Sequence, residues 1–241
     1  MEAFVRLLNQ KSSVDIGIAP PYLSIETVRK ALKAGHIQVG AQDVFWKTSG
    51  AFTGRVSAPM LADAGVTFCL VGHSETRGKF GKLEVPETTV GYFGETDETV
   101  NLKIHSLLFQ SITPILCVGE TLAERDLGNT DSVIRGQLLG ALAGIESPEF
   151  THGVVAYEPV WAIGTGKTCD TKEAERVCKM IRTTLSEIFD ESTANSVRIL
   201  YGGSVKAANA SDLFSQPNID GGLVGGASLD PIEFSKIVLS A

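Results

Sequence analysis

The sequence predicts an α/β fold of the parallel (β/α)8-barrel type, in a single domain that spans residues 1–241. The length of 241 residues is close to the ~250 typical of one such barrel, and it is sufficient for one sizeable core. Short apolar segments alternate with segments of helical spacing along the chain. The apolar segments are almost continuously hydrophobic, which is typical of strands buried on both faces of a parallel sheet.

Seven strands are predicted, each followed by a polar loop, at residues 14–19, 37–42, 68–72, 114–118, 154–157, 197–201 and 222–224. Helical patterns lie between them, for example at residues 25–34, 133–143, 172–188 and 231–239. The last of these begins with Asp230 as the N-cap and Pro231 at the first helical position. Residues 1–9 have the apolar spacing of a helix. A closed barrel of this type needs eight strands, so one strand, the first, is missing from the count.

Composition and charge favour a small-molecule substrate over a polymeric or membrane partner. The net charge is 21 − 28 = −7, and the sequence has no block of basic residues. It therefore shows no basic surface of the kind that binds a nucleic acid or an anionic membrane. The four cysteines have no Cys-x-x-Cys spacing, which favours reduced thiols over disulfides or a metal site. No cationic leader and no run of 18 apolar residues is found. We therefore expect a soluble, cytoplasmic protein that needs neither metal nor organic cofactor.

Residues 156–167, Ala-Tyr-Glu-Pro-Val-Trp-Ala-Ile-Gly-Thr-Gly-Lys, form the most informative segment. An apolar strand ends in Glu158, Pro159 holds that residue in extended angles, and Gly164 and Gly166 give the far end of the loop unusual conformational freedom. The segment thus predicts a carboxylate at a strand end beneath a hinged lid. Taken alone, it fits equally well a strand-to-helix connection in which the glutamate caps a helix.

Three further segments end at neighbouring positions of the predicted sheet. His73 lies where the strand at 68–72 gives way to a helix or turn, a place where a lone histidine is more often structural. Glycine pairs follow the last two strands, in Tyr-Gly-Gly-Ser-Val at 201–205 and in Val-Gly-Gly-Ala-Ser at 224–228. Bare backbone N–H groups at such positions can hold a phosphate. Two pairs at adjacent strands are much stronger evidence for a phosphate site than one pair.

These motifs together resemble the triosephosphate isomerase family, from about residue 14 to the C-terminus. The family's signature stands intact at 156–167, Gly-His-Ser-Glu at 72–75, Tyr-Gly-Gly-Ser-Val at 201–205 and Gly-Gly-Ala-Ser-Leu at 225–229. Cys-Val-Gly-Glu-Thr-Leu at 117–122 is similar to the family's corresponding strand and loop. The resemblance implies a TIM (β/α)8-type barrel that interconverts dihydroxyacetone phosphate and glyceraldehyde 3-phosphate.

The resemblance also implies the roles of individual residues. Glu158 would be the base that takes the proton next to the carbonyl, His73 the neutral electrophile that polarises the carbonyl, and Glu75 a supporting carboxylate. The substrate phosphate would be held by four residues of the late loops and the lid, namely Gly164, Ser204, Gly225 and Gly226. A proton next to a carbonyl is only weakly acidic, so the base needs groups that stabilise the enediolate oxygen.

The sequence departs from the family at the first strand, whose terminal Asn-x-Lys motif has no equivalent here. Removal of one preorganised oxyanion donor typically costs about 10²–10³ in rate, so we expect an isomerase with impaired activity. Lys47, in the loop after residues 37–42, is a poor substitute, because surface loops often carry a solvated lysine. Two alternatives remain: a catalytically crippled homologue that binds triose phosphates, and an N-terminally truncated chain, which an in-frame strand encoded upstream of Met1 would reveal.

Two other departures concern the surface. Residues 81–93 look inserted, and we expect an exposed loop there rather than an edge cover or a new interface. The family's dimer loop inserts a threonine beside the partner's first loop, but here that loop is Gly-Ala-Phe-Thr-Gly-Arg at 50–55, with Thr53 followed by Arg55. Any homodimer is therefore expected to have an altered interface.

Overall fold

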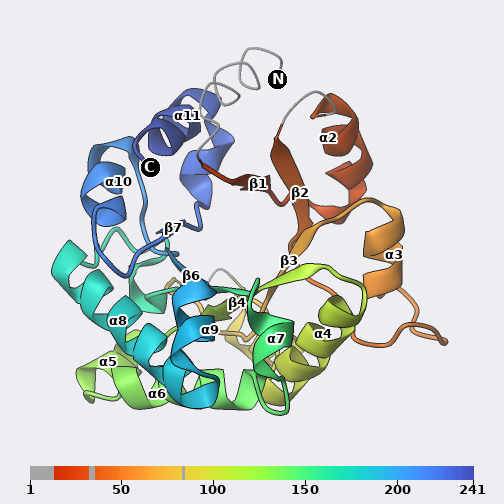
Figure 1. Cartoon of the computed structure of the whole chain (residues 1–241), viewed down its shortest axis with the longest axis horizontal. Helices are drawn as coiled ribbons and strands as arrows, with labels where there is room; N and C mark the ends of the chain where they lie inside the picture. The colour runs from red at the N-terminus through yellow and green to blue at the C-terminus, as the bar shows by residue number, and fades with distance from the viewer. Residues whose placement is uncertain (1–13, 33–35, 83–84) are drawn as a thin grey trace.

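The computed structural model describes residues 14–32, 36–82 and 85–241. Within these residues the chain forms one seven-stranded parallel sheet whose strands follow each other in sequence order. The strands are β1 (Ile16–Ile18), β2 (Ile37–Ala41), β3 (Phe68–Val71), β4 (Thr113–Val118), β5 (Val154–Tyr157), β6 (Arg198–Tyr201) and β7 (Gly221–Gly222). All seven predicted strands are confirmed. The sheet curls around a central axis with the helices outside it, as in a TIM-type fold (Figure 1).

The α-helices that cover the outside are α2 (Ile25–Ala31), α3 (Ala58–Asp63), α4 (Asp97–Phe109), α5 (Leu122–Asp126), α6 (Thr130–Ala141), α7 (Ser147–Phe150), α8 (Thr171–Ile188), α9 (Glu191–Ser196), α10 (Ala207–Phe214) and α11 (Pro231–Leu239). Helix α11 has the predicted bounds, and the Asp230 side chain accepts hydrogen bonds from the N–H groups of Ile232 and Glu233. Helix α6 begins three residues before the predicted start, because its polar first turn carries no apolar periodicity. The predicted helix at 1–9 lies outside the described residues.

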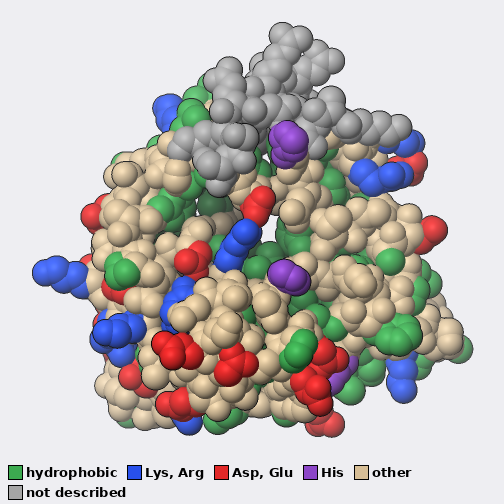
Figure 2. Space-filling view, viewed as in Figure 1, with side chains coloured by type: hydrophobic (Ala, Val, Ile, Leu, Met, Phe, Trp, Pro, Cys, Tyr) green, Lys and Arg blue, Asp and Glu red, His purple; other side chains and the backbone are tan. Residues whose placement is uncertain are grey.

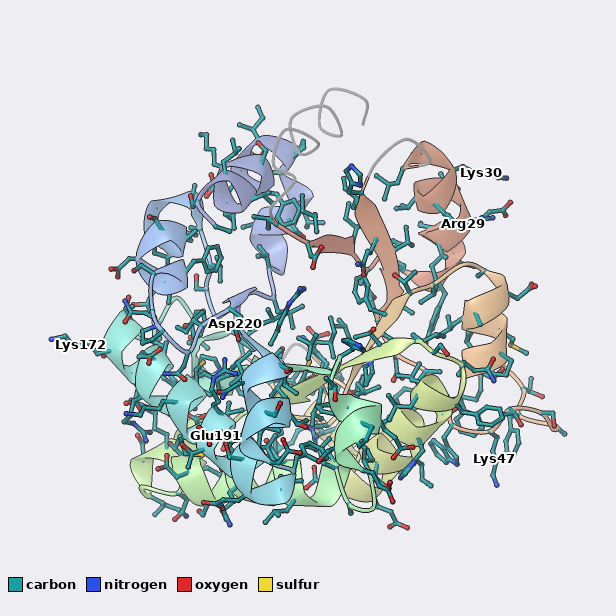
Figure 3. All side chains as sticks on the ribbon, viewed as in Figure 1. Arg29, Lys30, Lys47, Lys172, Glu191 and Asp220 are labelled. Atoms are coloured by element: carbon teal, nitrogen blue, oxygen red, sulfur yellow. The ribbon has the colours of Figure 1, made fainter. Side chains whose placement is uncertain are left out.

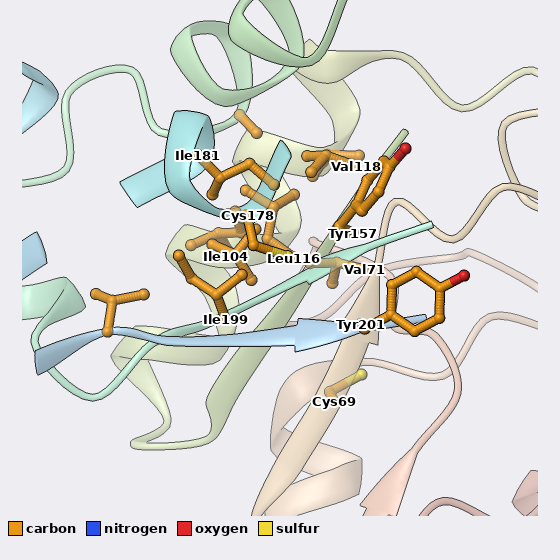
Figure 4. Close-up of a cluster of buried hydrophobic side chains, with 14 of the residues drawn as sticks. Cys69, Val71, Ile104, Leu116, Val118, Tyr157, Cys178, Ile181, Ile199 and Tyr201 are labelled. Carbon is orange, nitrogen blue, oxygen red and sulfur yellow. The ribbon is translucent and has the colours of Figure 1, made fainter. Parts of the chain in front are cut away.

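Side chains along the central strands alternate between two apolar layers. Residues that face outward pack against the helices, and Figure 4 shows Val71, Leu116 and Ile199 of the sheet beside Ile104 of α4 and Ile181 of α8. The residues between them form a separate inward cluster of Phe68, Leu70, Ile115, Cys117 and Ala156. This period of two, with both faces apolar, is the reason why the strands read as continuous hydrophobic runs.

The ring of Phe68 fills the inside of the sheet next to β1 and β2. A Cβ atom at Gly17 would lie 2.6 Å from this ring, and one at Gly40 would lie 2.2 Å from it. Both distances are far below van der Waals contact, so the two glycines leave the space that the ring occupies. The inward layer is thus packed with side chains, as in a closed barrel of this type.

Strands β1 and β7 are the two edges of the sheet, and no pairing joins them among the described residues. The curl nevertheless brings distant parts of the chain together, because Arg198 on β6 forms an ion pair of 2.7 Å with Asp15, just before β1. In Figure 1, α7 and α9, which precede β5 and β6, lie in front, so the viewer faces the amino ends of the strands. Figure 2 shows this face hollowed near its centre, with acidic and basic side chains beside the hollow.

The described part of the inserted segment contains a 3-10 helix, η2 (Glu87–Tyr92), in place of β structure. Most of its residues are exposed, and 81% of Tyr92 is accessible. Gly81, at the start of the segment, is half-buried and packs closely against the loop that follows β5. In the described part of the chain, no helix is long and apolar enough to cross a membrane.

Candidate active site

The side chains of Glu158 and His73 meet at the carboxyl ends of β5 and β3. Glu158 directly follows β5, and its N–H continues the ladder by donating to the carbonyl of Val118 at 2.8 Å. The His73 Nε2 atom lies 2.8 Å from Glu158 Oε1. The other carboxylate oxygen, Oε2, accepts the N–H of Ser74 at 3.1 Å. The Glu158 side chain is almost fully buried, so both of its oxygens are satisfied by protein groups rather than by solvent.

The proton on the His73 ring can be assigned from its two neighbours. The backbone N–H of Glu75 points at Nδ1 at 3.3 Å, so Nδ1 accepts and the ring proton lies on Nε2, facing Glu158. Burial lowers the pKa of His73, but the hydrogen bond and negative charge of Glu158 more than offset this, and the net pKa is raised. A raised pKa favours a charged ring, whereas the donor at Nδ1 favours a neutral one. When the ring is neutral its proton therefore lies on Nε2, because a proton on Nδ1 would face the N–H group of Glu75.

The predicted supporting carboxylate, Glu75, lies at the margin of this arrangement. Its Oε2 atom is 3.8 Å from His73 Nδ1, and 68% of its side chain is exposed. A buried carboxylate, Glu95, has the closer structural role. Its Oε2 atom accepts from the N–H of Gly72 and from the Thr76 hydroxyl, which lie on either side of His73.

Glu95 is itself held by a buried ion cluster. Its side chain is 5% exposed and pairs with Lys103 of α4, whose ammonium also lies 2.5 Å from Asp43 Oδ1. The cluster ties the turn that carries His73 to α4 and to the loop after β2. Burial raises the pKa of Asp43 in spite of Lys103. Such buried pairs fix geometry, because loss of one partner leaves an uncompensated charge.

The loop after Glu158 has one packed half and one open half. Residues Val160–Ala162 form the 3-10 helix η3 and are buried. Gly164 and Gly166 have φ values of 68° and 78°, and a Cβ atom on either would meet nothing within 4 Å. The predicted left-handed glycine conformations are therefore confirmed, and the second half of the loop is exposed.

Trp161 anchors the packed half of this loop. Its Nε1–H donates to Glu120 Oε1 at 2.8 Å, and the guanidinium of Arg125 lies 4.5 Å from the centre of its ring. Glu120 is fully buried, and burial raises its pKa even though Trp161 and Tyr157 donate to it. The Trp161 side chain thus fastens the loop to the segment that follows β4.

The predicted phosphate residues follow β5, β6 and β7, three consecutive strands of the sheet of which β5 carries Glu158. A Cβ atom at Gly202 would lie 3.0 Å from Glu158 Cγ, so the glycine pair after β6 begins next to the carboxylate. Leu223 donates its N–H to the carbonyl of Tyr201, which places the loops that contain Ser204 and Gly225 on neighbouring strands. Gly225 and Gly226 are exposed at the start of η4 (Gly226–Leu229), and Ser204 is half-buried. Gly164 lies in the open half of the loop after β5.

Neither a metal nor a substitute lysine is apparent in the described residues. Across residues 14–32, 36–82 and 85–241, no group of three or more His, Cys, Asp or Glu side chains could hold a metal ion. All four cysteines are free and buried. Lys47 is exposed and lies at the outer margin of the molecule (Figure 3), away from the strands that carry Glu158 and His73.

Two groups at this site were not predicted from the sequence. The N–H of Ser74 was missed although the residue lies in the Gly-His-Ser-Glu motif, because a backbone contact leaves no trace in the side-chain pattern. Gly119 was missed as well. A Cβ atom there would lie 1.7 Å from the carbonyl oxygen of Glu158, so only glycine allows β4 and β5 to approach so closely beyond their ends.

Comparison with known proteins gives consistent matches over the whole length. A family model described as "Triosephosphate isomerase" matches residues 1–241. The triosephosphate isomerase of Acetivibrio thermocellus is 46% identical over 232 residues, which cover 96% of this chain and 86% of the relative. That of Moorella thermoacetica is 47% identical, with coverages of 97% and 88%. That of Trichlorobacter lovleyi is 47% identical, with coverages of 99% and 90%.

Proposed function

The chain belongs to the triosephosphate isomerase family, and from this premise and the geometry of its site we propose that it interconverts dihydroxyacetone phosphate and glyceraldehyde 3-phosphate. The observation that carries the proposal is the 2.8 Å contact between Glu158 and His73 at the carboxyl ends of β5 and β3. A buried carboxylate and a ring N–H at one point are the base and the hydrogen-bond donor that an enediolate reaction requires.

The reaction begins when the substrate displaces the contact between these two side chains. Glu158 then accepts the proton from the carbon next to the carbonyl, and the Nε2–H of His73 is directed to the carbonyl oxygen. The ring N–H stabilises the negative charge that develops on this oxygen. The hydroxyl proton of the enediolate then passes from one oxygen to the other through His73 Nε2, which gives a proton to the first oxygen and takes one from the second, and the proton held by Glu158 returns to the neighbouring carbon. Glu75, whose side chain is mostly exposed, places a negative charge near His73 Nδ1 from the solvent side.

The substrate phosphate is held by backbone and hydroxyl donors of three loops. Gly225 and Gly226 present N–H groups that no side chain covers, and Ser204 adds a hydroxyl from the adjacent strand end. Gly164 adds a donor when the loop 159–167 closes as a lid. Closure excludes water from the enediolate and strengthens each electrostatic contact inside the site.

A homodimer with an altered interface belongs to the same proposal, as does a cytoplasmic location in glycolysis and gluconeogenesis. Residues 51–55 are exposed along their whole length, and the Arg55 guanidinium lies 5.7 Å from the centre of the Phe45 ring. An arginine in this position changes the charge of the surface that the family uses for pairing. The single domain predicted for residues 1–241 is also part of this proposal.

The function is tested by replacement of the proposed base. Glu158→Gln and Glu158→Asp are expected to lower turnover of either triose phosphate by about 10²–10⁴-fold, the typical contribution of a positioned acid or base. A coupled spectrophotometric assay measures the rate in both directions. Glu191→Gln, at an exposed position of α9 on the opposite face (Figure 3), is the control. Turnover that survives both Glu158 substitutions belongs to a contaminant, and the assignment would then be wrong.

A binding protein without appreciable turnover is the second candidate, because the family's Asn-x-Lys motif has no equivalent in the sequence. It predicts that 2-phosphoglycolate raises the melting temperature while turnover stays at background. An absence of any ligand-induced shift would eliminate this candidate.

A further inference from the structure

The turn that carries His73 continues directly into a short segment that reaches the lid. Three backbone hydrogen bonds close the turn, from Arg77 N–H to the His73 carbonyl, from Gly78 N–H to that of Glu75, and from Lys79 N–H to that of Ser74. Residues 78–81, which we call the His73 extension, follow without a break. The extension therefore has one end fixed to the active-site turn.

The other end of the extension, Gly81, lies against the backbone of the lid. A Cβ atom at Gly81 would be 2.2 Å from the carbonyl oxygen of Ile163 and 2.4 Å from that of Val160. It would also be 3.1 Å from Thr165 Cγ2. Gly81 is not among the glycines with positive φ, so glycine is needed here for space and not for its backbone angle.

The extension is held in place by contacts of the three residues that precede Gly81. The Lys79 ammonium lies 3.0 Å from Glu124 Oε1 at the start of α5. The Phe80 ring packs edge-on against Phe93 at 5.5 Å between centres. A Cβ atom at Gly78 would lie only 2.8 Å from the carbonyl oxygen of Phe93. These contacts make the extension a fixed surface against which the lid can be set.

The first half of the lid is consequently held on two sides. Glu120 binds Trp161 from the direction of β4, and Gly81 contacts the carbonyls of Val160 and Ile163 from the direction of β3. Gly164 and Gly166 have open space around them. Beyond Ile163 the Thr165 hydroxyl donates to the carbonyl of Trp161 at 2.8 Å, so the lid is least restrained at Gly164 and Gly166.

We propose that the His73 extension is a positioning element for the lid and that Gly81 is a positioning residue, which acts through the lid backbone without touching substrate. This inference rests on the proposed function. It assigns a role to residues 78–81, which set the first half of the lid at a fixed distance from the turn that carries His73, and of these only Gly81 belongs to the inserted region.

Misplacement of the lid has a distinct chemical consequence. In an enediolate that is open to water and motion, the C–O bond to the phosphate can break. Its electron pair then leaves with inorganic phosphate, and the enediolate electrons form the double bond of an enol that becomes methylglyoxal. The ratio of phosphate released to isomerisation therefore measures how well the lid is seated, independently of the total rate.

The test compares Gly81→Ala with Gly91→Ala. Gly91 lies in the same inserted region, its φ is not positive, and a Cβ atom there meets nothing within 4 Å. Both changes are made in a Trp46→Phe background, which leaves Trp161 of the lid as the single tryptophan. Three quantities are measured: Trp161 emission without ligand, the Kd for 2-phosphoglycolate, and phosphate released per isomerisation.

Gly81→Ala is expected to change the Trp161 emission, to raise the Kd by on the order of 10- to 100-fold, as displacements near 1 Å can do, and to raise the phosphate ratio. Gly91→Ala should match the background protein. Equal emission and Kd in the two variants would overturn the inference. If Gly81→Ala does not fold, Lys79→Met, which removes the tether to Glu124, takes its place with the same direction of effect and the same criterion.

The emission measurement needs neither turnover nor ligand, so it separates the two proposals. If the Trp46→Phe protein has no turnover, the proposed function is refuted. An emission difference between the Gly81→Ala and Gly91→Ala variants would still support the positioning role of the His73 extension.

Discussion

The proposed base and the proposed electrophile are in direct contact with each other. Glu158 is buried with one oxygen on His73 Nε2 and the other on the N–H of Ser74. A carboxylate that is buried in this way is stabilised by charge-assisted hydrogen bonds, which are roughly twice as strong as neutral ones. The two contacts fix the orientation of the carboxylate toward His73.

The contact between Glu158 and His73 predicts how the pKa of His73 changes when Glu158 is replaced. Glu158→Gln removes the negative charge that outweighs burial, so the pKa of His73 should fall. Imidazole NMR signals followed against pH measure the change, and the signals of the other three histidines are the internal control. An unchanged or raised pKa of His73 in the variant would contradict the assigned cause.

The sign of the accompanying stability change follows from the raised pKa. A group whose folded-state pKa is raised stabilises the fold fully below its unfolded-state pKa, and this contribution is lost as the pH rises through the folded-state pKa. The free energy of unfolding of the wild-type protein should therefore exceed that of Glu158→Gln by a margin that shrinks as the pH rises through the folded-state pKa of His73. Chemical unfolding at a series of pH values measures this loss.

Side chains that carry chemistry were easier to predict than the groups that place them. Glu158 and His73 stand at strand ends in distinctive motifs, so the sequence pointed to both, and the structure brings them together. Their roles, and those of Glu75, Gly164, Ser204, Gly225 and Gly226, stay predictions. The Ser74 N–H acts through backbone atoms that approach each other only in the folded chain, and no local pattern reports such an approach.

At the scale of single elements, helix starts are fixed by side-chain caps. Asp230 caps α11 with hydrogen bonds of 2.8 Å to the N–H of Ile232 and 3.2 Å to that of Glu233. Asp170 caps α8 in the same way by accepting the N–H of Glu173. Both caps follow loops that contain predicted site residues, so the caps fix where those loops end.

Loss of the α11 cap should lower stability by a measurable amount. Asp230→Ala is expected to reduce the free energy of unfolding by about 1 kcal/mol, the usual value for such a cap. For a chain of this size the melting temperature should drop by about 2–4 °C. Asp230→Asn keeps an acceptor oxygen and should remain close to the wild-type protein. Calorimetry that finds the two variants equally stable would show that the cap is unimportant.

The inserted region was the element least accessible to prediction. Residues 88–90, Thr-Thr-Val, are of types common in strands but lie in the 3-10 helix η2, in which both the N–H and the hydroxyl of Thr89 donate to the carbonyl of Pro86. β-propensity expresses packing on a pleated surface more than a preference of the backbone. In the part of the chain that the structure describes, no strand pairs with residues 87–92, so local hydrogen bonds decide their conformation. The contact of Gly81 with the lid is equally invisible in the sequence.

At the scale of the whole molecule, the sheet is strongest at its centre. Each of β3 to β6 has four to six residues and two neighbours, whereas β1 has three residues, β7 has two, and each has one partner among the described residues. The number and order of strands followed from the sequence, because each strand is a separate apolar run. The ion pair between Asp15 and Arg198 did not, because it depends on how far the sheet curls.

Native-state hydrogen exchange should show that the central strands are more strongly protected than the two edge strands. Amides of β4 and β5 are expected to exchange only through global unfolding, and those of β1 and β7 through local opening at a much lower free energy. Exchange at low denaturant concentrations, resolved by NMR or mass spectrometry, measures both. The prediction fails if β1 is as well protected as β5.

Strand β4 separates the two strands that carry His73 and Glu158. It pairs with β3 on one side and β5 on the other, and Gly119 at its end lets the Glu158 backbone come close. β4 thus sets the distance between the strands that carry the proposed base and the proposed electrophile. A change at β4 is therefore expected to alter the separation of these two side chains, and with it the length of the carbonyl compound that fits between them, while both side chains stay as they are.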